Sequence, residues 1–132
     1  MEKIMQAIST LDEVAALATL AFIVLDVFSG MMKGAAEHNL SSKIMRRGFW
    51  HKASLVLTLV VAGTIDTATT LGLHIGFDAP IFEAVCIYIC FMELVSILEN
   101  IAAVNPDLKG SKIFKLLDHG KKEEYREEQQ ES

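Results

Sequence analysis

Five carboxylate side chains interrupt the most apolar stretches of this 132-residue chain. They belong to Asp26, Asp66, Glu83, Glu93 and Glu99. A charged side chain near the centre of a bilayer costs at least about 2.5–3.5 kcal/mol. Asp26, Asp66 and Glu93 lie deepest in their stretches. We therefore expect each of these three to be protonated, hydrogen-bonded to a neighbouring helix or exposed to water.

The deep carboxylates share helical stripes with small and polar residues, at spacings of three and four positions. The stripes contain Asp26, Gly30, Lys33 and Glu37; Gly63, Asp66, Thr67, Thr70 and His74; and Cys86, Cys90, Glu93, Ser96, Glu99 and Asn100. Small residues also recur every four positions, in the pairs Gly30/Gly34 and Gly72/Gly76. Such spacing lets helix backbones approach closely in a membrane. Each stretch thus has a broad apolar side and a narrower polar side.

Two interpretations of these stripes remain open. The polar groups either hold one bundle of helices together, or they line contacts between copies of the chain or a pore. The candidates for oligomerisation or pore lining are Asp26, Gly30, Gly34, Asp66, Gly72, Gly76, Glu93, Ser96, Glu99 and Asn100. Three helices enclose no aqueous lumen, so conduction would require several chains.

Catalytic and cofactor-binding patterns are absent from the sequence. No serine stands in a nucleophile or general-base motif, and no glycine-rich phosphate loop is present. His74 and Asp66 have no third ligand at a spacing suited to a metal. Cys86 and Cys90 are expected to be small buried hydrophobes, with a bridge between copies as the weaker alternative. We expect neither an enzyme nor a cofactor, and no basic stripe predicts nucleic-acid binding.

Three apolar stretches must position these side chains. Residues 14–32, 53–77 and 79–104 contain only the five carboxylates as formal charges. About 20 apolar residues in a helix cross the hydrocarbon core, so spans are expected at about 12–34, 53–77 and 80–104. Thr10 and Glu13 have capping-box spacing, which predicts that the first helix begins there. A cleavable signal peptide is the alternative for the first stretch, but no small-residue cleavage site follows it.

The segments outside the spans are polar. Residues 33–52 form a basic connection, 78–80 a tight turn, and Asn105-Pro106 a cap and first position of a further helix. Residues 106–118 are amphipathic and basic, which favours an interfacial helix, and 119–132 form a charged tail. The fold expected is an all-α membrane protein: a transmembrane domain of three helices over 1–105, the interfacial amphipathic helix, and the charged C-terminal tail.

The distribution of Lys and Arg predicts the orientation. Basic residues concentrate in the 33–52 connection and after residue 105, and short basic loops stay in the cytoplasm. The N-terminus is therefore expected outside and the C-terminus inside. Trp50 falls at the cytoplasmic end of the second span, where interfacial tryptophans collect. A cytoplasmic-face basic belt at the depth of Glu99 is expected from Lys33, Arg46, Arg47 and Lys52.

Several motifs in this order resemble the toxin-secretion/phage-lysis holin family of Gram-positive phages and prophages. The resemblance covers about residues 20–117. Its elements are Asp26-Val27-Phe28-Ser29-Gly30, Leu40-Ser41-Ser42, Gly48, Lys52, Asp66, the run Glu93-Leu94-Val95-Ser96-Ile97-Leu98-Glu99-Asn100, Pro106 and Leu108. The run of residues 93–100 is the most specific of these. Val27 departs from the pattern, because an aromatic residue usually follows the acid.

The resemblance implies a non-enzymatic protein that accumulates in the bacterial cytoplasmic membrane, associates with copies of itself and opens lesions. An endolysin, or a toxin without a signal peptide, would pass through them as cargo. Two alternatives remain. One is a small ion or proton channel with Asp66, His74 and Glu93 as a relay. The other is a membrane adaptor whose tail recruits a cytosolic partner.

Overall fold

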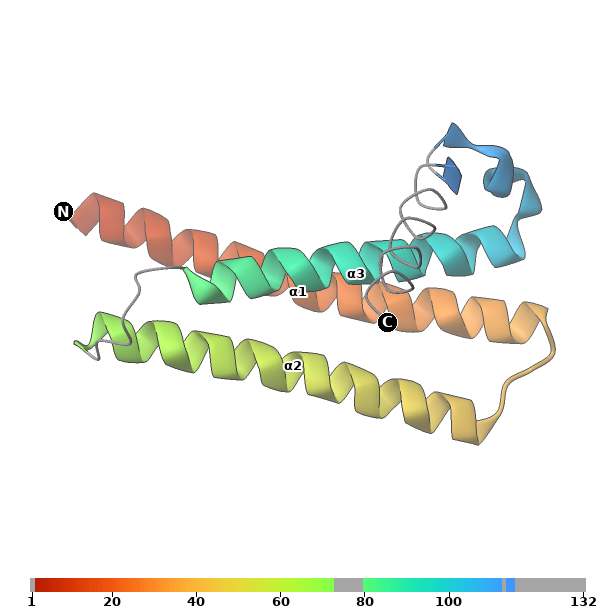
Figure 1. Ribbon diagram of the computed structural model, residues 1–132, viewed down its shortest axis with the longest axis horizontal. Helices are drawn as coiled ribbons and strands as arrows, with labels where there is room; N and C mark the ends of the chain where they lie inside the picture. The colour runs from red at the N-terminus through yellow and green to blue at the C-terminus, as the bar shows by residue number, and fades with distance from the viewer. Residues whose placement is uncertain (1, 73–79, 113, 116–132) are drawn as a thin grey trace, which may run out of the picture.

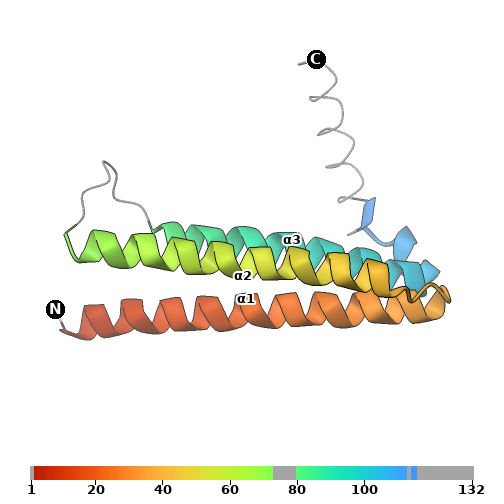
Figure 2. The same ribbon diagram turned by 90° about the horizontal axis from the view of Figure 1, so that it is seen from below.

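The computed structural model describes residues 2–72, 80–112, 114 and 115. Within them the chain forms three α-helices, α1 (Glu2–Ala36), α2 (Ser42–Thr70) and α3 (Ile81–Val104), and a short 3-10 helix, η1 (Pro106–Gly110). The three long helices lie side by side (Figures 1 and 2). α1 and α3 run in the same direction and α2 runs against them. The end of the bundle where residues 37–41 join α1 to α2 is called the loop end below.

All three α-helices are long and apolar enough to cross a membrane, over Asp12–Ala36, Ser42–Thr70 and Ile81–Val104. The prediction of an all-helical protein with three membrane-spanning helices is therefore confirmed.

Three helix boundaries differ from the expectation. α2 ends at Thr70, with Leu71 as its C-cap, rather than near residue 77. α1 is helical from Glu2 onwards, so Thr10 lies inside the helix and the predicted capping box at that position is wrong. α2 begins at Ser42 rather than near residue 53, with the hydroxyl of Ser41 accepting a hydrogen bond from the amide of Ile44 at 3.2 Å. Lys and Arg are good helix formers, so the helix continues through charged sequence that a hydropathy pattern assigns to a connection.

The segment after α3 is capped as the sequence predicts. The side chain of Asn105 accepts a hydrogen bond from the amide of Asp107 at 3.3 Å, and Pro106 occupies the first turn. Residues Pro106–Gly110 form the 3-10 helix η1, and the backbone of Ser111 after it is extended, so the expected helix does not run unbroken from residue 106. Outside the described residues lie positions 113 and 116–118 of the expected amphipathic helix, the tail 119–132, His74, Gly76 and positions 78 and 79 of the expected turn.

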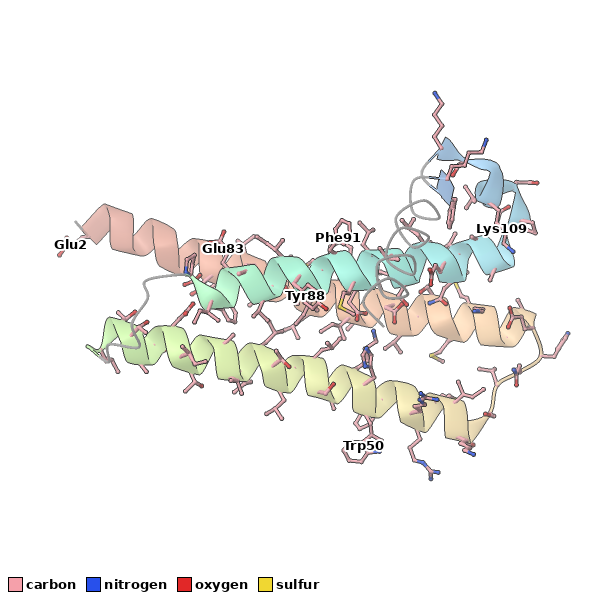
Figure 3. All side chains as sticks on the ribbon, viewed as in Figure 1. Glu2, Trp50, Glu83, Tyr88, Phe91 and Lys109 are labelled. Carbon is pink, nitrogen blue, oxygen red and sulfur yellow. The ribbon has the colours of Figure 1, made fainter. Side chains whose placement is uncertain are left out.

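The buried core is small and involves all three helices. Ile23 of α1, Leu59 of α2 and Cys86 and Ile89 of α3 form it, each at most 7% exposed. Large apolar side chains cover the outside of the bundle, among them Leu17, Phe28, Trp50, Leu57 and Phe91. In Figure 3, Trp50 projects from α2 and Phe91 from α3 in opposite directions, away from the bundle. A surface of this kind suits lipid, because lipid tails are as apolar as the side chains themselves.

Candidate functional site

An ion-paired cluster joins the three helices inside the bundle. The ammonium of Lys52 on α2 lies 2.7 Å from the carboxylate of Asp26 on α1 and also pairs with the carboxylate of Glu93 on α3. The three side chains are 14%, 11% and 3% exposed, respectively. We call Asp26, Lys52 and Glu93 the charged triad. Each helix contributes one member, so the triad fixes how α2 sits against the other two.

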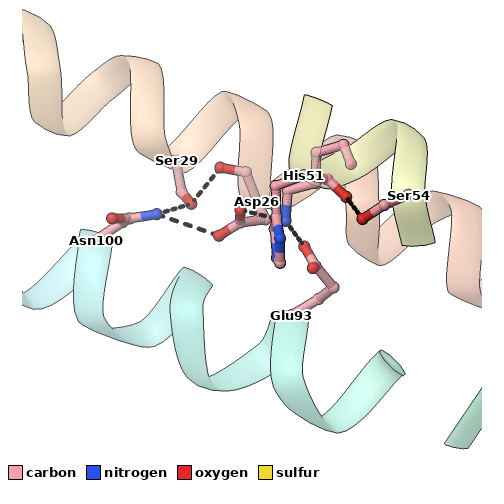
Figure 4. A network of polar contacts seen from close by, with 7 residues as sticks. Asp26, Ser29, His51, Ser54, Glu93 and Asn100 are labelled. Atoms are coloured by element: carbon pink, nitrogen blue, oxygen red, sulfur yellow. Dashed lines mark hydrogen bonds and ion pairs between the residues drawn. The ribbon is translucent and has the colours of Figure 1, made fainter. Parts of the chain in front are cut away.

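Hydrogen bonds extend the triad towards the loop end (Figure 4). The side-chain amide of Asn100 donates to the Asp26 carboxylate at 3.2 Å and to the hydroxyl of Ser29 at 3.0 Å. Ser29 in turn donates to the backbone carbonyl of Asp26 at 3.0 Å. Gly30 faces the same amide: a Cβ built there would lie 3.7 Å from the Asn100 nitrogen. Four of the predicted site residues, Asp26, Gly30, Glu93 and Asn100, thus meet inside one chain.

The three charges of the triad favour one another as buried partners. Two carboxylates face one ammonium, and removing any member leaves a charge in a low-dielectric interior without its partner. Isolated charges are far more costly to bury than paired ones. Asn100 supplies a further donor to Asp26. Within the described part of the chain, no buried side-chain nitrogen or oxygen lacks a hydrogen-bond partner.

Asp66 occupies a second polar contact, remote from the triad. Its two carboxylate oxygens accept hydrogen bonds from the backbone amides of Ile81 and Phe82, at 3.2 and 2.7 Å. These amides belong to the first turn of α3, where helix amides lack intrahelical partners and negative charge is favoured. Pro80, at the cap position, provides no side-chain hydrogen bond. Asp66 of α2 therefore caps α3 from outside that helix.

The two polar contacts of α2 lie far apart along the bundle. Counting from Phe82 to Glu93 along α3 gives about 16 Å at 1.5 Å per residue. A proton relay from Asp66 to Glu93 would need further groups between them, and His74 lies outside the described residues.

The other predicted residues lie outside these two contacts. A Cβ on Gly34 would meet the side chain of Leu40 at 3.0 Å, so Gly34 packs against the connection between α1 and α2. Gly72, with φ of +103°, follows the end of α2, so the expectation that it stands on a helix surface for close packing is wrong. Ser96 is half-buried on α3, and Glu99 is exposed.

Lys52 differs from the other members of the expected basic belt. Lys33, Arg46, Arg47 and Glu99 are each five to seven residues from the triad member on their own helix, towards the loop end. That spacing puts them about 8–10 Å from the triad along the helix axes. Lys52 lies deeper and pairs with Asp26 and Glu93.

Thr19 is a buried polar residue that sequence reasoning missed. Its side chain is fully buried, donates to the carbonyl of Ala15 at 2.8 Å and lies 3.3 Å from the sulfur of Cys90. A threonine can satisfy its hydroxyl within its own helix, so its position carries no sequence signal. Cys86 is buried, as expected, and Cys90 is partly so; both are free thiols.

No metal site is formed by the described residues, because no three of their His, Cys, Asp or Glu side chains converge.

Comparison with known proteins adds family information. A family model described as "Bacteriophage holin family" matches residues 3–119. An uncharacterised protein of Clostridium perfringens strain 13 is 36% identical over 86 residues, covering 64% of this chain and 59% of the relative. An uncharacterised 14.9 kDa protein from the nagH 3′ region of Clostridium perfringens is 32% identical over 93 residues, covering 70% of this chain and 66% of the relative.

A third relative, an uncharacterised protein of Halalkalibacterium halodurans, is 30% identical over 81 residues, covering 61% of this chain and 59% of the relative. The chain spans 59 to 66% of the length of these curated relatives. No solved structure matches it significantly.

Proposed function

The chain belongs to the bacteriophage holin family, and from that premise we propose that it assembles with copies of itself and opens lesions that release an endolysin or a toxin without a signal peptide. Family membership and the three apolar helices support a multi-pass protein of the cytoplasmic membrane. The proposed orientation puts the loop end and the C-terminus in the cytoplasm, because Lys33, Arg46 and Arg47 gather there.

The observation that carries the proposal is the closed charged triad beneath an apolar surface. In a single chain, Lys52 pairs with both Asp26 and Glu93, while the side chains that face outwards are largely apolar. Such a chain dissolves in lipid as a closed bundle and accumulates without opening a path for ions. A lesion needs polar groups on its wall. The triad, Ser29 and Asn100 are polar side chains that lie inside the single bundle, and in the proposed assembly they would face such a wall.

Assembly would exchange contacts within one chain for contacts between chains. Interhelical hydrogen bonds in membranes contribute about 0.6–2 kcal/mol each, so one pair does not hold a complex. Several such contacts repeated around a ring or raft do, and they produce a concentration threshold. The glycine pair Gly30/Gly34 is the proposed point of close helix approach, with Asp66, Ser96 and Glu99 as further polar contacts. A threshold of this kind is what timed lysis requires.

Inducible expression in bacteria, with and without a co-expressed endolysin, tests this function. We expect sudden lysis only when both proteins are present, and escape of a cytosolic enzyme through the lesions. Passage of ions without the enzyme would contradict the proposal and favour a small channel.

Substitutions in α3 test the role of its carboxylates. Glu93→Ala and Glu99→Ala are expected to shift the onset of lysis and the size of the cross-linked oligomer. Glu83→Ala, an exposed glutamate in the first turn of α3, is the matched control and should leave both unchanged. Unchanged timing and oligomer size in both the Glu93 and Glu99 variants would remove these residues from the mechanism.

A further inference from the structure

We propose that Lys43, Arg46, Arg47 and Trp50 bind the phosphate group of an anionic phospholipid at the loop end of α2. We call these four residues the basic face of α2. This inference does not depend on lesion formation, because it concerns the lipid that surrounds a single chain.

The four residues form one face of a regular helix. They stand at positions i, i+3, i+4 and i+7 in α2, which lie together on a helix surface. All four side chains are exposed, with Trp50 67% exposed. Lys52 follows Trp50 by two positions, about 200° around the helix, and points into the charged triad. The basic face therefore points away from α1 and α3, as Trp50 does in Figure 3.

The basic face lies at the polar end of α2, before the apolar run that starts at Ala53. Arg46 and Arg47 precede Lys52 by six and five residues, which corresponds to about 8–9 Å along the helix. Beyond Arg46 the helix has only four residues before it starts at Ser42. Helical side chains lean towards the N-terminus of their helix. In α2 that direction leads out of the membrane, so both guanidinium groups extend towards the headgroups rather than towards the bilayer centre.

The chemistry of the face favours a lipid over a free anion. Guanidinium groups bind phosphate oxygens through paired hydrogen bonds, and tryptophan has an amphipathic ring suited to the headgroup level. Below Trp50, the same face continues with the apolar side chains of Leu57 and Val61, 63% and 52% exposed. A phospholipid fits both the basic residues and the apolar side chains below them, whereas inorganic phosphate fits only the basic residues.

An aromatic pair borders the basic face. The rings of Phe49 and Trp50 make an edge-to-face contact with centroids 5.9 Å apart. Trp50 follows Arg46 and Arg47 by four and three positions, which is about one helical turn. Arg46 and Arg47 are exposed on the outer side of α2, which favours a partner in the surrounding lipid.

Trp50 provides a direct probe, because it is the only tryptophan in the chain. The purified full-length chain is reconstituted in vesicles of zwitterionic phosphatidylcholine that contain equal fractions of brominated phosphatidylglycerol or brominated phosphatidylcholine. Bromine quenches the indole in proportion to occupancy of the adjacent site. We expect phosphatidylglycerol to be preferred by about fivefold, the effect of one basic residue at a membrane surface. In the double variant Arg46→Gln/Arg47→Gln the preference should fall below twofold.

Controls separate this site from the charge of the whole chain and from soluble anions. Lys109→Gln/Lys112→Gln removes two charges elsewhere in the described chain and should keep the preference. Arg46→Lys/Arg47→Lys should retain part of it, since the charge stays and the paired hydrogen bonds are lost. Circular dichroism verifies that each variant keeps its helices. Equal quenching by the two lipids in the wild type, an equal loss in the Lys109/Lys112 variant, or relief of quenching by inorganic phosphate would each overturn the proposal.

Discussion

The interface between α1 and α3 differs in kind from the attachment of α2. α1 packs on α3 along a line of buried small and apolar side chains, including Thr19, Ile23, Cys86 and Ile89. α2 contributes Leu59 and Ala62 as its buried residues. Its polar links to the other helices are concentrated at two levels, the charged triad near the loop end and Asp66 at the start of α3.

This difference indicates which helix can rearrange. The hydrophobic effect does not drive helices together inside a membrane. The stability of a helix pair therefore depends on its contact area and its interhelical hydrogen bonds. The α1–α3 pair has both an extended packed interface and interhelical hydrogen bonds. The polar contacts of α2 lie at two levels about 16 Å apart, and in the proposed assembly either would be exchanged for the same contact with another chain. We infer that α1 and α3 remain together during assembly while α2 changes partners.

The largest expected effect follows from Lys52→Met. The substitution leaves Asp26 and Glu93 buried without their cation, and breaking a buried ion pair from one side costs about 3–5 kcal/mol. Unfolding of the purified chain in a zwitterionic detergent, followed by circular dichroism, should show a free energy of unfolding lower by that amount. Lys43→Met, an exposed lysine of the same helix, is the control and should change it by less than about 0.5 kcal/mol.

A second substitution distinguishes lost charge balance from lost packing. Adding Glu93→Gln to Lys52→Met removes one of the two uncompensated carboxylates, so part of the stability should return. If the double variant is no more stable than Lys52→Met alone, the ion pairs do not attach α2, and the contrast with the α1–α3 interface loses its basis.

The sequence predicts the three spans and the buried polar residues of α1 and α3, but it does not predict their partner on α2. The three spans follow from composition, because only the bilayer requires such long apolar helices. The importance of Asp26, Glu93 and Asn100 follows from the cost of burying them. Their common partner Lys52 was assigned to a surface belt, since hydropathy places a lysine at the edge of a span as part of the connection. Lys52 points into the bundle because it lies within α2, which begins at Ser42, on the side of that helix that faces α1 and α3.

Asp66 illustrates a similar limit. A mid-span aspartate indicates a polar partner, but a backbone amide has no side-chain signature in sequence. Its actual partners, the amides of Ile81 and Phe82, depend on where α3 begins relative to α2. Sequence patterns therefore identify which groups require a partner more readily than they identify the partner.

An intermediate effect is expected from Asp66→Ala. The first turn of α3 would lose the acceptor for two amides, and loss of a helix cap costs about 0.5–2 kcal/mol. Asp66→Asn keeps one acceptor oxygen and should recover part of this loss. Hydrogen exchange of the Ile81 and Phe82 amides, measured by NMR in detergent, should increase in Asp66→Ala. Thr64→Ala, which removes an exposed hydroxyl of α2 bonded only within its own helix, should leave this exchange unchanged.

The smallest effect is expected at the α1–α3 interface, from Thr19→Val. Valine preserves the shape of the side chain, and the lost hydroxyl bonds chiefly to the Ala15 carbonyl of its own helix. Interhelical hydrogen bonds in membranes average about 0.6 kcal/mol, so loss of the contact with Cys90 should lower the free energy of unfolding by less than about 1 kcal/mol. Thr58→Val, at an exposed position that also bonds within its own helix, corrects for the intrahelical bond. A corrected loss as large as that of Lys52→Met would show that the α1–α3 interface depends on the contact between Thr19 and Cys90, and that α2 is not the weakly attached helix.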